Sequence, residues 1–181
     1  MEEKDPIYSA ELIVDDIADG LPDQPTPTLS HYDESGQACM VDISAKASTR
    51  REAVANAFVE LSPTVLAALP QNPKGNPLDV ARFAGIQAAK QTSNLIPMCH
   101  PIALTFVDIK LTLVANGVAI EATAATVAGT GVEMEAMVAA SIAALTVYDM
   151  TKALDKGIRI RDVALLRKSG GKSGDFKREI A

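Results

Sequence analysis

Aromatic side chains are scarce in this sequence. Its 181 residues include no tryptophan, and aromatic residues make up only 4%, whereas hydrophobic residues reach 48%. The core must therefore be built mainly from Ala, Val, Leu and Ile, whose small or branched side chains let helices approach closely. We expect one domain with a large core and tight helix packing, including packing across a subunit interface.

Cysteines are also few, and they lack the spacing of a metal site. The chain has two, Cys39 and Cys99, and its first residues, M-E-E-K-D, show no basic segment followed by an apolar one. Both features favour a reducing compartment without a targeting signal, so we expect a cytoplasmic protein. Together with His31 and His100, the cysteines form no C-x-x-C or H-x-x-x-H pair, which argues against structural zinc.

Basic charge is nearly missing from the N-terminal part of the chain. Residues 1–28 contain eight acids and one lysine, whereas the remaining 153 residues carry fifteen acids and sixteen basic residues. Three prolines near the end of that stretch are typical of a linker. We therefore expect an acidic, linker-like extension over 1–28 and one domain over 29–181. No basic stripe with interleaved aromatic residues is present, so general nucleic-acid binding is disfavoured.

One long helix is predicted over Gly131–Lys156. Glu133 and Glu135 lie in its first turn, and Lys152 and Lys156 lie in its last, as the helix dipole favours. Its apolar stretch of about twelve residues is well short of the ~20 that span a bilayer, so the pattern indicates a core helix without membrane insertion.

One face of this helix combines acids with a lysine. At about 100° per residue, Glu135 and Asp149 fall within about 40° of each other, and Lys152 lies one turn beyond Asp149. In the simplest structural interpretation the first acids cap the helix and Asp149 forms a solvated ion pair with Lys152. Because the residues between them are apolar nearly all round, however, we expect the helix and these charges to be sheltered from bulk water. Buried charges are paired or functional, so they are candidate catalytic groups.

The remaining elements complete an α+β pattern. We expect a short helix over 62–69, with Ser62 as its N-cap, and a second helix over 78–92. We expect strands over 53–61, 105–114, 118–125 and 158–166, although the alanines of 53–61 leave a helix open there. Asn116-Gly117 is a hairpin signal between the second and third strands. The order βαββαβ closes most economically as an antiparallel sheet with the helices packed on one face.

Two proline-rich or glycine-rich stretches are candidate binding loops. Prolines bracket Leu95–Pro101 (L-I-P-M-C-H-P), which predicts a rigid loop that presents Cys99 and His100. Taken alone, each is more typical of a core cysteine or a structural histidine. The basic stretch Arg167–Lys177 (R-K-S-G-G-K-S-G-D-F-K) is not a Walker A motif, because Leu166 stands at the first glycine position. It is either an anion-binding loop or a frayed tail.

Taken together, these motifs resemble one family. The strings M-V-D-I-S-A-K-A, K-G-N-P, L-I-P-M-C-H-P, G-V-E-M-E-A, A-A-L-T-V-Y-D-M-T-K-A and K-S-G-G-K-S-G-D-F-K occur in this order. Over roughly residues 29–178, the chain is similar to the cyclic pyranopterin monophosphate synthase family, molybdenum cofactor biosynthesis protein C. The strings are long and specific, and only the first 28 residues and the last few lie outside the region of similarity.

The resemblance implies a fold and a reaction. The family has a ferredoxin-like α+β fold and forms a homohexamer, a trimer of dimers, with the active site at a dimer interface. As a phosphorus–oxygen lyase, it converts (8S)-3′,8-cyclo-7,8-dihydroguanosine 5′-triphosphate into cyclic pyranopterin monophosphate and releases pyrophosphate. No motif demands a metal or an organic cofactor, and the sequence leaves open whether magnesium accompanies the triphosphate.

The resemblance also assigns roles to individual residues. The family's essential acid–base aspartate and its partner lysine fall on Asp149 and Lys152. Positions that contact the substrate, or otherwise function in the family, fall on Met98, Cys99, His100, Glu133, Met134, Glu135, Lys74 and Lys168. Gly129 departs from the pattern, because some family members carry a lysine at this position.

The residue types agree with this chemistry. Rearranging a cyclised purine nucleotide needs proton transfers at ring nitrogens and at a ribose hydroxyl, so an acid and a base must coexist. We expect Asp149 and Lys152 to exchange protons with the substrate, while His100 and the two glutamates orient it. We expect Lys74, Lys168 and the glycine-rich tail to bind the triphosphate.

Two alternatives of other classes stay open. One is an inactive ferredoxin-like homologue that binds pterins or nucleotides and acts in regulation. The other is a transferase that uses Cys99 as a nucleophile, which would form a covalent adduct and lose activity on Cys99→Ser.

Overall fold

The computed structural model describes residue 31 and residues 35–179. The acidic extension expected over 1–28 therefore lies outside the described residues. Along the described chain, the elements are β1 (Thr49–Glu60), α1 (Pro63–Ala68), the 3₁₀ turn η3 (Leu69–Gln71), α2 (Pro77–Lys90), α3 (Thr92–Leu95), β2 (Leu104–Val114), β3 (Gly117–Ala128), α4 (Glu133–Thr151), β4 (Arg159–Ser169) and β5 (Phe176–Lys177).

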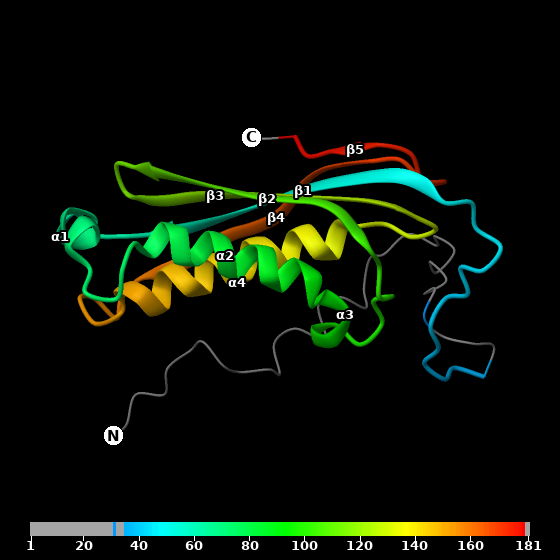
Figure 1. Ribbon diagram of the computed structural model, residues 1–181, viewed down its shortest axis with the longest axis horizontal. Coiled ribbons are helices and arrows are strands. Elements are labelled where there is room, and N and C mark those ends of the chain that lie inside the picture. The colour runs from blue at the N-terminus through cyan, green and yellow to red at the C-terminus, as the bar shows by residue number, and fades with distance from the viewer. Residues whose placement is uncertain (1–30, 32–34, 180–181) are drawn as a thin grey trace, which may run out of the picture.

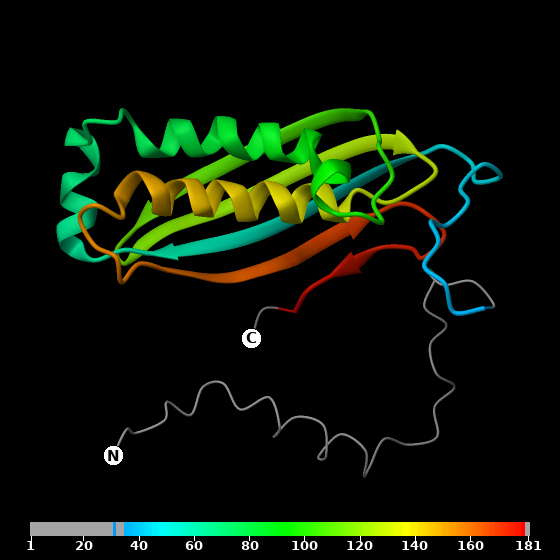
Figure 2. The ribbon, with the colours of Figure 1, turned by 90° about the horizontal axis from the view of Figure 1, so that it is seen from below.

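The strands form one sheet in the order β2-β3-β1-β4-β5, and every neighbouring pair is antiparallel. Helices α2 and α4 lie side by side and cover one face of this sheet (Figures 1 and 2). The prediction of a ferredoxin-like α+β fold with helices on one face is therefore confirmed. Among the described residues, no helix is long and apolar enough to cross a membrane.

The predicted ends of the long helix were wrong. The long helix begins at Glu133 and ends at Thr151, five residues before the predicted end, so that Lys152 is its C-cap. A tighter turn follows, in which the Leu154 N–H donates to Thr151 O at 2.9 Å, because the chain must reverse to enter β4. The C-terminal tail is not frayed within the described residues, since Phe176 pairs with Lys168 in the sheet.

The core between the helices and the sheet is aliphatic, as the composition predicted. Ile109, Val59 and the alanines of α4 are fully buried. The two helices lie in close contact at Gly85 of α2, where a Cβ would lie 3.0 Å from Ala139 O and 3.2 Å from Ala143 Cβ. Small residues on both helices therefore set the distance between α2 and α4.

Short polar caps fix the loops that carry charged residues. Ser62 Oγ accepts from the Val65 N–H at the start of α1, as the sequence predicted. Asn76 Oδ1 accepts from the Leu78 N–H at 3.0 Å and starts α2. The turn before it places Lys74 next to Gly75, whose φ of +96° favours glycine.

Candidate functional site

The start of α4 and the loop after α3 line a cavity of about 300 Å³, here called the main cavity. Six of the residues singled out in the sequence lie together in its lining: Met98, Cys99, His100, Glu133, Met134 and Glu135. His31 and Lys46 reach the same cavity from the N-terminal part of the chain. The structure thus brings together the two motifs that the sequence treated as separate candidates.

The loop that carries Cys99 and His100 is held by two hydrogen bonds. The Cys99 N–H donates to Ile96 O at 3.1 Å, which closes a turn around Pro97. His100 Nε2 lies 2.9 Å from Val41 O. Because a carbonyl oxygen only accepts, this nitrogen carries a hydrogen and the imidazole ring is fixed in orientation.

Glu135 is a buried acid at the edge of the main cavity. The residue is 4% exposed, and burial raises its pKa to about 6, with a further contribution from the charge of Glu133. Burial also raises the pKa of the Cys99 thiol, and the nearby Glu135 charge adds to this effect. Cys99 is therefore held as a neutral thiol, whereas Glu135 can change its protonation state close to neutral pH.

Lys168 joins the C-terminal tail to the start of α4. Its Nζ lies 3.8 Å from Glu133 Oε1 and donates to Ser173 Oγ at 2.7 Å. The lysine side chain is only 15% exposed, so this ion pair is better shielded from water than a surface pair.

A larger basic cavity of about 760 Å³ adjoins the main cavity. The two cavities have Lys46, Thr130 and Gly131 in common. Arg51 and Lys172 line the basic cavity but not the main cavity. Neither Lys46 nor Arg51 is among the candidate site residues predicted from the sequence. The closely spaced basic residues of 46–51 were the available signal.

Backbone geometry keeps the basic cavity open. Arg51 Nε donates to Ala128 O at 3.0 Å, which fixes the guanidinium at the end of the sheet. Gly171 has a φ of +83°, and a Cβ there would overlap the Arg51 guanidinium. The glycine-rich tail thus lies against Arg51 because it has no side chain at this point.

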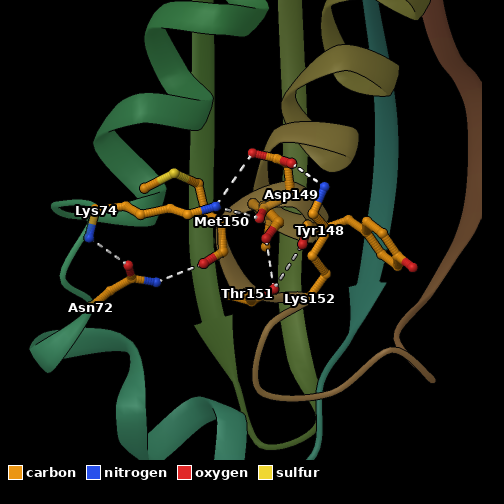
Figure 3. A network of polar contacts seen from close by, with 8 residues as sticks. Asn72, Lys74, Tyr148, Asp149, Met150, Thr151 and Lys152 are labelled. Atoms are coloured by element: carbon orange, nitrogen blue, oxygen red, sulfur yellow. Dashed lines mark hydrogen bonds and ion pairs between the residues drawn. The ribbon is translucent and has the colours of Figure 1, made fainter.

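The acid–base candidates lie at the other end of α4 (Figure 3). Lys152 Nζ is 2.6 Å from Asp149 Oδ1, and Lys74 Nζ is 3.8 Å from Asp149 Oδ2. The hydrogen bond from Lys152, followed by the charges of Lys152 and Lys74, lowers the pKa of Asp149. The same hydrogen bond raises the pKa of Lys152. The aspartate is therefore held charged and the ammonium protonated.

A second set of hydrogen bonds fixes this cluster to the turn before α2. Asn72 Nδ2 donates to Met150 O at 2.8 Å, and Asn72 Oδ1 accepts from the Lys74 N–H at 2.9 Å (Figure 3). Lys74 Nζ also donates to Asp149 O at 3.3 Å. The turn and the end of α4 thus form one polar unit.

The expected shelter of Asp149 and Lys152 is wrong for the single chain. Their side chains are 57% and 50% exposed, because they lie on the open side of this helix end, away from the buried Met150 and Thr151. Glu135 and Asp149 are fourteen residues apart on one helix, which separates them by about 21 Å. Asp149 and Lys152 therefore do not reach the main cavity of their own chain.

Comparison with known proteins identifies the family. The model of the MoaC family matches residues 40–171, well over half of the chain. The chain belongs to the MoaC family. A relative from Roseiflexus sp. (strain RS-1), named cyclic pyranopterin monophosphate synthase, is 54% identical over 152 residues. The match covers 82% of this chain and 96% of the relative. Relatives of the same name from Parvibaculum lavamentivorans and Nostoc sp. are 51% and 54% identical, each over 82% of this chain and over 96% and 90% of the relative.

Gly129, the departure from the MoaC pattern noted in the sequence, lines the basic cavity. A Cβ at this position would lie 3.3 Å from both Cβ and O of Lys46. Lys46 therefore packs where a larger residue at position 129 would need space. Elsewhere in this MoaC chain, no three His, Cys, Asp or Glu side chains among the described residues gather as a metal site.

Proposed function

We propose that this protein is a cyclic pyranopterin monophosphate synthase. It converts (8S)-3′,8-cyclo-7,8-dihydroguanosine 5′-triphosphate into cyclic pyranopterin monophosphate and pyrophosphate, a step of molybdenum cofactor biosynthesis. The observation that carries the proposal is the junction of the two cavities, where an acid- and imidazole-lined space adjoins a basic one. Membership of the MoaC family and relatives of that name at 51–54% identity support it.

The two cavities suit the two halves of this substrate. In the main cavity, Met98 and Met134 offer apolar contacts to the fused rings, whereas His100 and Glu135 bond to their polar edges. The triphosphate extends into the basic cavity, where Lys46, Arg51 and Lys172 neutralise it. Charged donors bind phosphate oxygens more strongly than neutral ones, and glycine amides of the tail add further donors.

Catalysis needs a second copy of the chain. Asp149, which Lys152 and Lys74 contact, lies about 21 Å along α4 from Glu135, far beyond hydrogen-bond reach. A small substrate in the main cavity can meet them only if they come from a neighbouring subunit. We place the active site at a dimer interface for this reason.

Exposed apolar side chains support an oligomer. Phe83 of α2 is 73% exposed and Leu145 of α4 is 51% exposed, on the helical layer of the molecule. Phe106 and Val127 are more than half exposed on β2 and β3. Apolar surface of this kind is typical of subunit interfaces, and two such surfaces allow dimers to combine into a hexamer, a trimer of dimers.

Asp149 and Lys152 act as the proton-transfer pair. The lowered pKa of Asp149 keeps it a carboxylate that accepts a proton, and the raised pKa of Lys152 keeps it an ammonium that donates one. Lys74 holds the negative charge of Asp149 in place. Product formation then releases pyrophosphate from the basic cavity.

The first test is product formation. Incubation with (8S)-3′,8-cyclo-7,8-dihydroguanosine 5′-triphosphate is expected to yield cyclic pyranopterin monophosphate, detected by mass spectrometry. Asp149→Asn is expected to lower the rate by at least about 100-fold, because it removes the proton acceptor but leaves an exposed side chain of the same shape. Product formed by Asp149→Asn at the unaltered rate would refute the assignment.

The second test is complementation between subunits. Neither Asp149→Asn nor His100→Gln is expected to form product by itself. A refolded mixture of the two variants, however, contains dimers in which one of the two sites has both native residues. That mixture is expected to regain activity. A mixture of unaltered chains with the double variant is the control for dilution of sites. If the mixed single variants stay inactive, the shared site is wrong.

We also propose that residues 29–181 form the catalytic domain, that 1–28 is an appended extension, and that the protein works in the cytoplasm. Cys39 and Cys99 are both free thiols, as a reducing compartment favours. Deletion of 1–28 is expected to leave the rate of product formation unchanged.

A further inference from the structure

A second small cavity lies behind the main cavity, and we call it the rear cavity. Its volume is about 210 Å³, and Lys90, Thr92 and Ser93 line it from the end of α2 and from α3. It has two lining residues in common with the main cavity, His100 and Glu135. These two side chains therefore form the partition between the cavities.

The two partition residues differ in their freedom to move a proton. His100 Nε2 is hydrogen-bonded to Val41 O at 2.9 Å, so only Nδ1 is left to exchange a proton and the ring cannot pass one from nitrogen to nitrogen. Glu135 is the carboxyl group that both cavities have in common. It is therefore the partition residue suited to take a proton on one side and give it on the other.

The surroundings of Glu135 favour exchange near neutral pH. The titratable and charged groups around it are Cys99, His100, Glu133, Lys90, His31 and Lys46, which come from the loop after α3, from α4, from α2 and from the N-terminal part of the chain. Burial, with a smaller contribution from the Glu133 charge, outweighs the hydrogen bond from the backbone of Glu135 itself and raises the Glu135 pKa to about 6. A carboxyl with such a pKa is present in both protonation states at physiological pH, as proton transfer requires.

We propose that Glu135 carries protons between the substrate in the main cavity and solvent in the rear cavity. The inference rests on the proposed function, because a nucleotide that fills the main cavity expels the water from that side. The Glu135 O–H bond breaks as an O–H or N–H bond forms on the substrate. The carboxylate then regains a proton from solvent or a buffer acid by way of water in the rear cavity, beside exposed Lys90.

Filling the rear cavity tests this route. Ser93→Leu places a larger, apolar side chain in the rear cavity, whereas Asn94→Leu makes a similar change at the exposed neighbour, which lines neither cavity. With the proposed substrate, Ser93→Leu is expected to lower kcat roughly tenfold, leave KM unchanged and enlarge the solvent deuterium isotope effect. Asn94→Leu is expected to match the unaltered protein. If Ser93→Leu keeps the unaltered kcat and isotope effect, the route is wrong.

A second measurement needs no turnover. In a Cys39→Ser background, the rate of alkylation of Cys99 by iodoacetamide reports the charge of Glu135, because that charge raises the Cys99 pKa. The logarithm of the rate is expected to rise with pH along a line that is displaced downward near pH 6, where Glu135 becomes charged and raises the Cys99 pKa. We call this displacement the offset, and Glu135→Gln is expected to remove it.

The two measurements separate the proposals. If the offset is missing, Glu135 does not exchange protons in this range, and the route is overturned even when product forms. If the offset is present but no product forms, the synthase activity is refuted, and the proton route with it, while the titrating buried carboxyl stands.

Discussion

Two acids on one helix have opposite environments. Glu135 is buried and its pKa is raised, whereas Asp149 is half exposed and its pKa is lowered by Lys152 and Lys74. One acid thus holds a proton at a pH where the other is a carboxylate. This difference gives the proposed site both a proton donor and a proton acceptor made of the same functional group.

The raised pKa of Glu135 predicts a pH dependence of stability. The unfolded chain loses this proton near pH 4.5 and the folded chain near pH 6, so the free energy of unfolding falls as pH rises through this window. The expected loss is about 1–2 kcal/mol. Urea unfolding at fixed protein concentration measures it, and Glu135→Gln is expected to abolish this part of the pH dependence. Equal slopes for both proteins would contradict the prediction.

The basic cavity predicts a binding effect for Lys46. We expect Lys46→Gln to raise KM for the triphosphate substrate roughly tenfold with little change in kcat, because it removes a charge that contacts phosphate before and during reaction. Inhibition by pyrophosphate is expected to weaken in parallel. Lys110→Gln, at an exposed position on β2 outside both cavities, is the charge-matched control. An equal KM for the two variants would contradict the assignment.

Among the elements, α4 connects everything that bears on the site. Its first turn lines the main cavity, its alanines pack on α2 and the sheet, and its last turn presents Asp149. Its position depends on the close contact with Gly85 of α2. The spacing of the two helices therefore influences the shape of the main cavity.

Overpacking this contact tests the arrangement. Gly85→Leu is expected to lower the free energy of unfolding by about 1–3 kcal/mol, because a side chain has no space beside Ala139 and Ala143. Gln87→Leu, at an exposed position of the same helix, is expected to change stability little. Urea midpoints of the two variants give the comparison. A Gly85→Leu protein as stable as Gln87→Leu would show that the helices can move apart without cost.

At the scale of the whole molecule, a single chain contains the parts of the proposed site at two distant ends. The main and basic cavities lie at the N-terminal end of α4, and Asp149 with its lysines lies at the C-terminal end. A second chain packed antiparallel on the helical layer can place its Asp149 beside the cavities of the first chain, and the first chain's Asp149 beside its own cavities. If the site is shared as we propose, the protein is active only as an oligomer.

This arrangement predicts that activity depends on protein concentration. On dilution, the specific activity is expected to fall over the same range in which sedimentation velocity shows dissociation of the oligomer, because dissociated chains have incomplete sites. A fully active monomer would exclude the shared site.

Local patterns were enough to predict much of this protein. The order of strands and helices, the Ser62 cap and the pairing of Asp149 with Lys152 follow from interactions between residues close in sequence, which periodicity and spacing report. The similarity of the long motifs also pointed to six of the residues that line the main cavity. The end of α4 at Thr151 was missed because helix ends depend on where the chain must turn.

Tertiary structure decided which of these residues are buried and which distant residues meet. Lys172 lies far along the chain from Lys46 and Arg51, and only the packing of the tail against the end of the sheet brings it into one cavity with them. The same helix buries Glu135 and exposes Asp149, although its sequence is apolar along nearly its whole length. Solvation depends on which elements cover a residue, and that information is not contained in the local pattern.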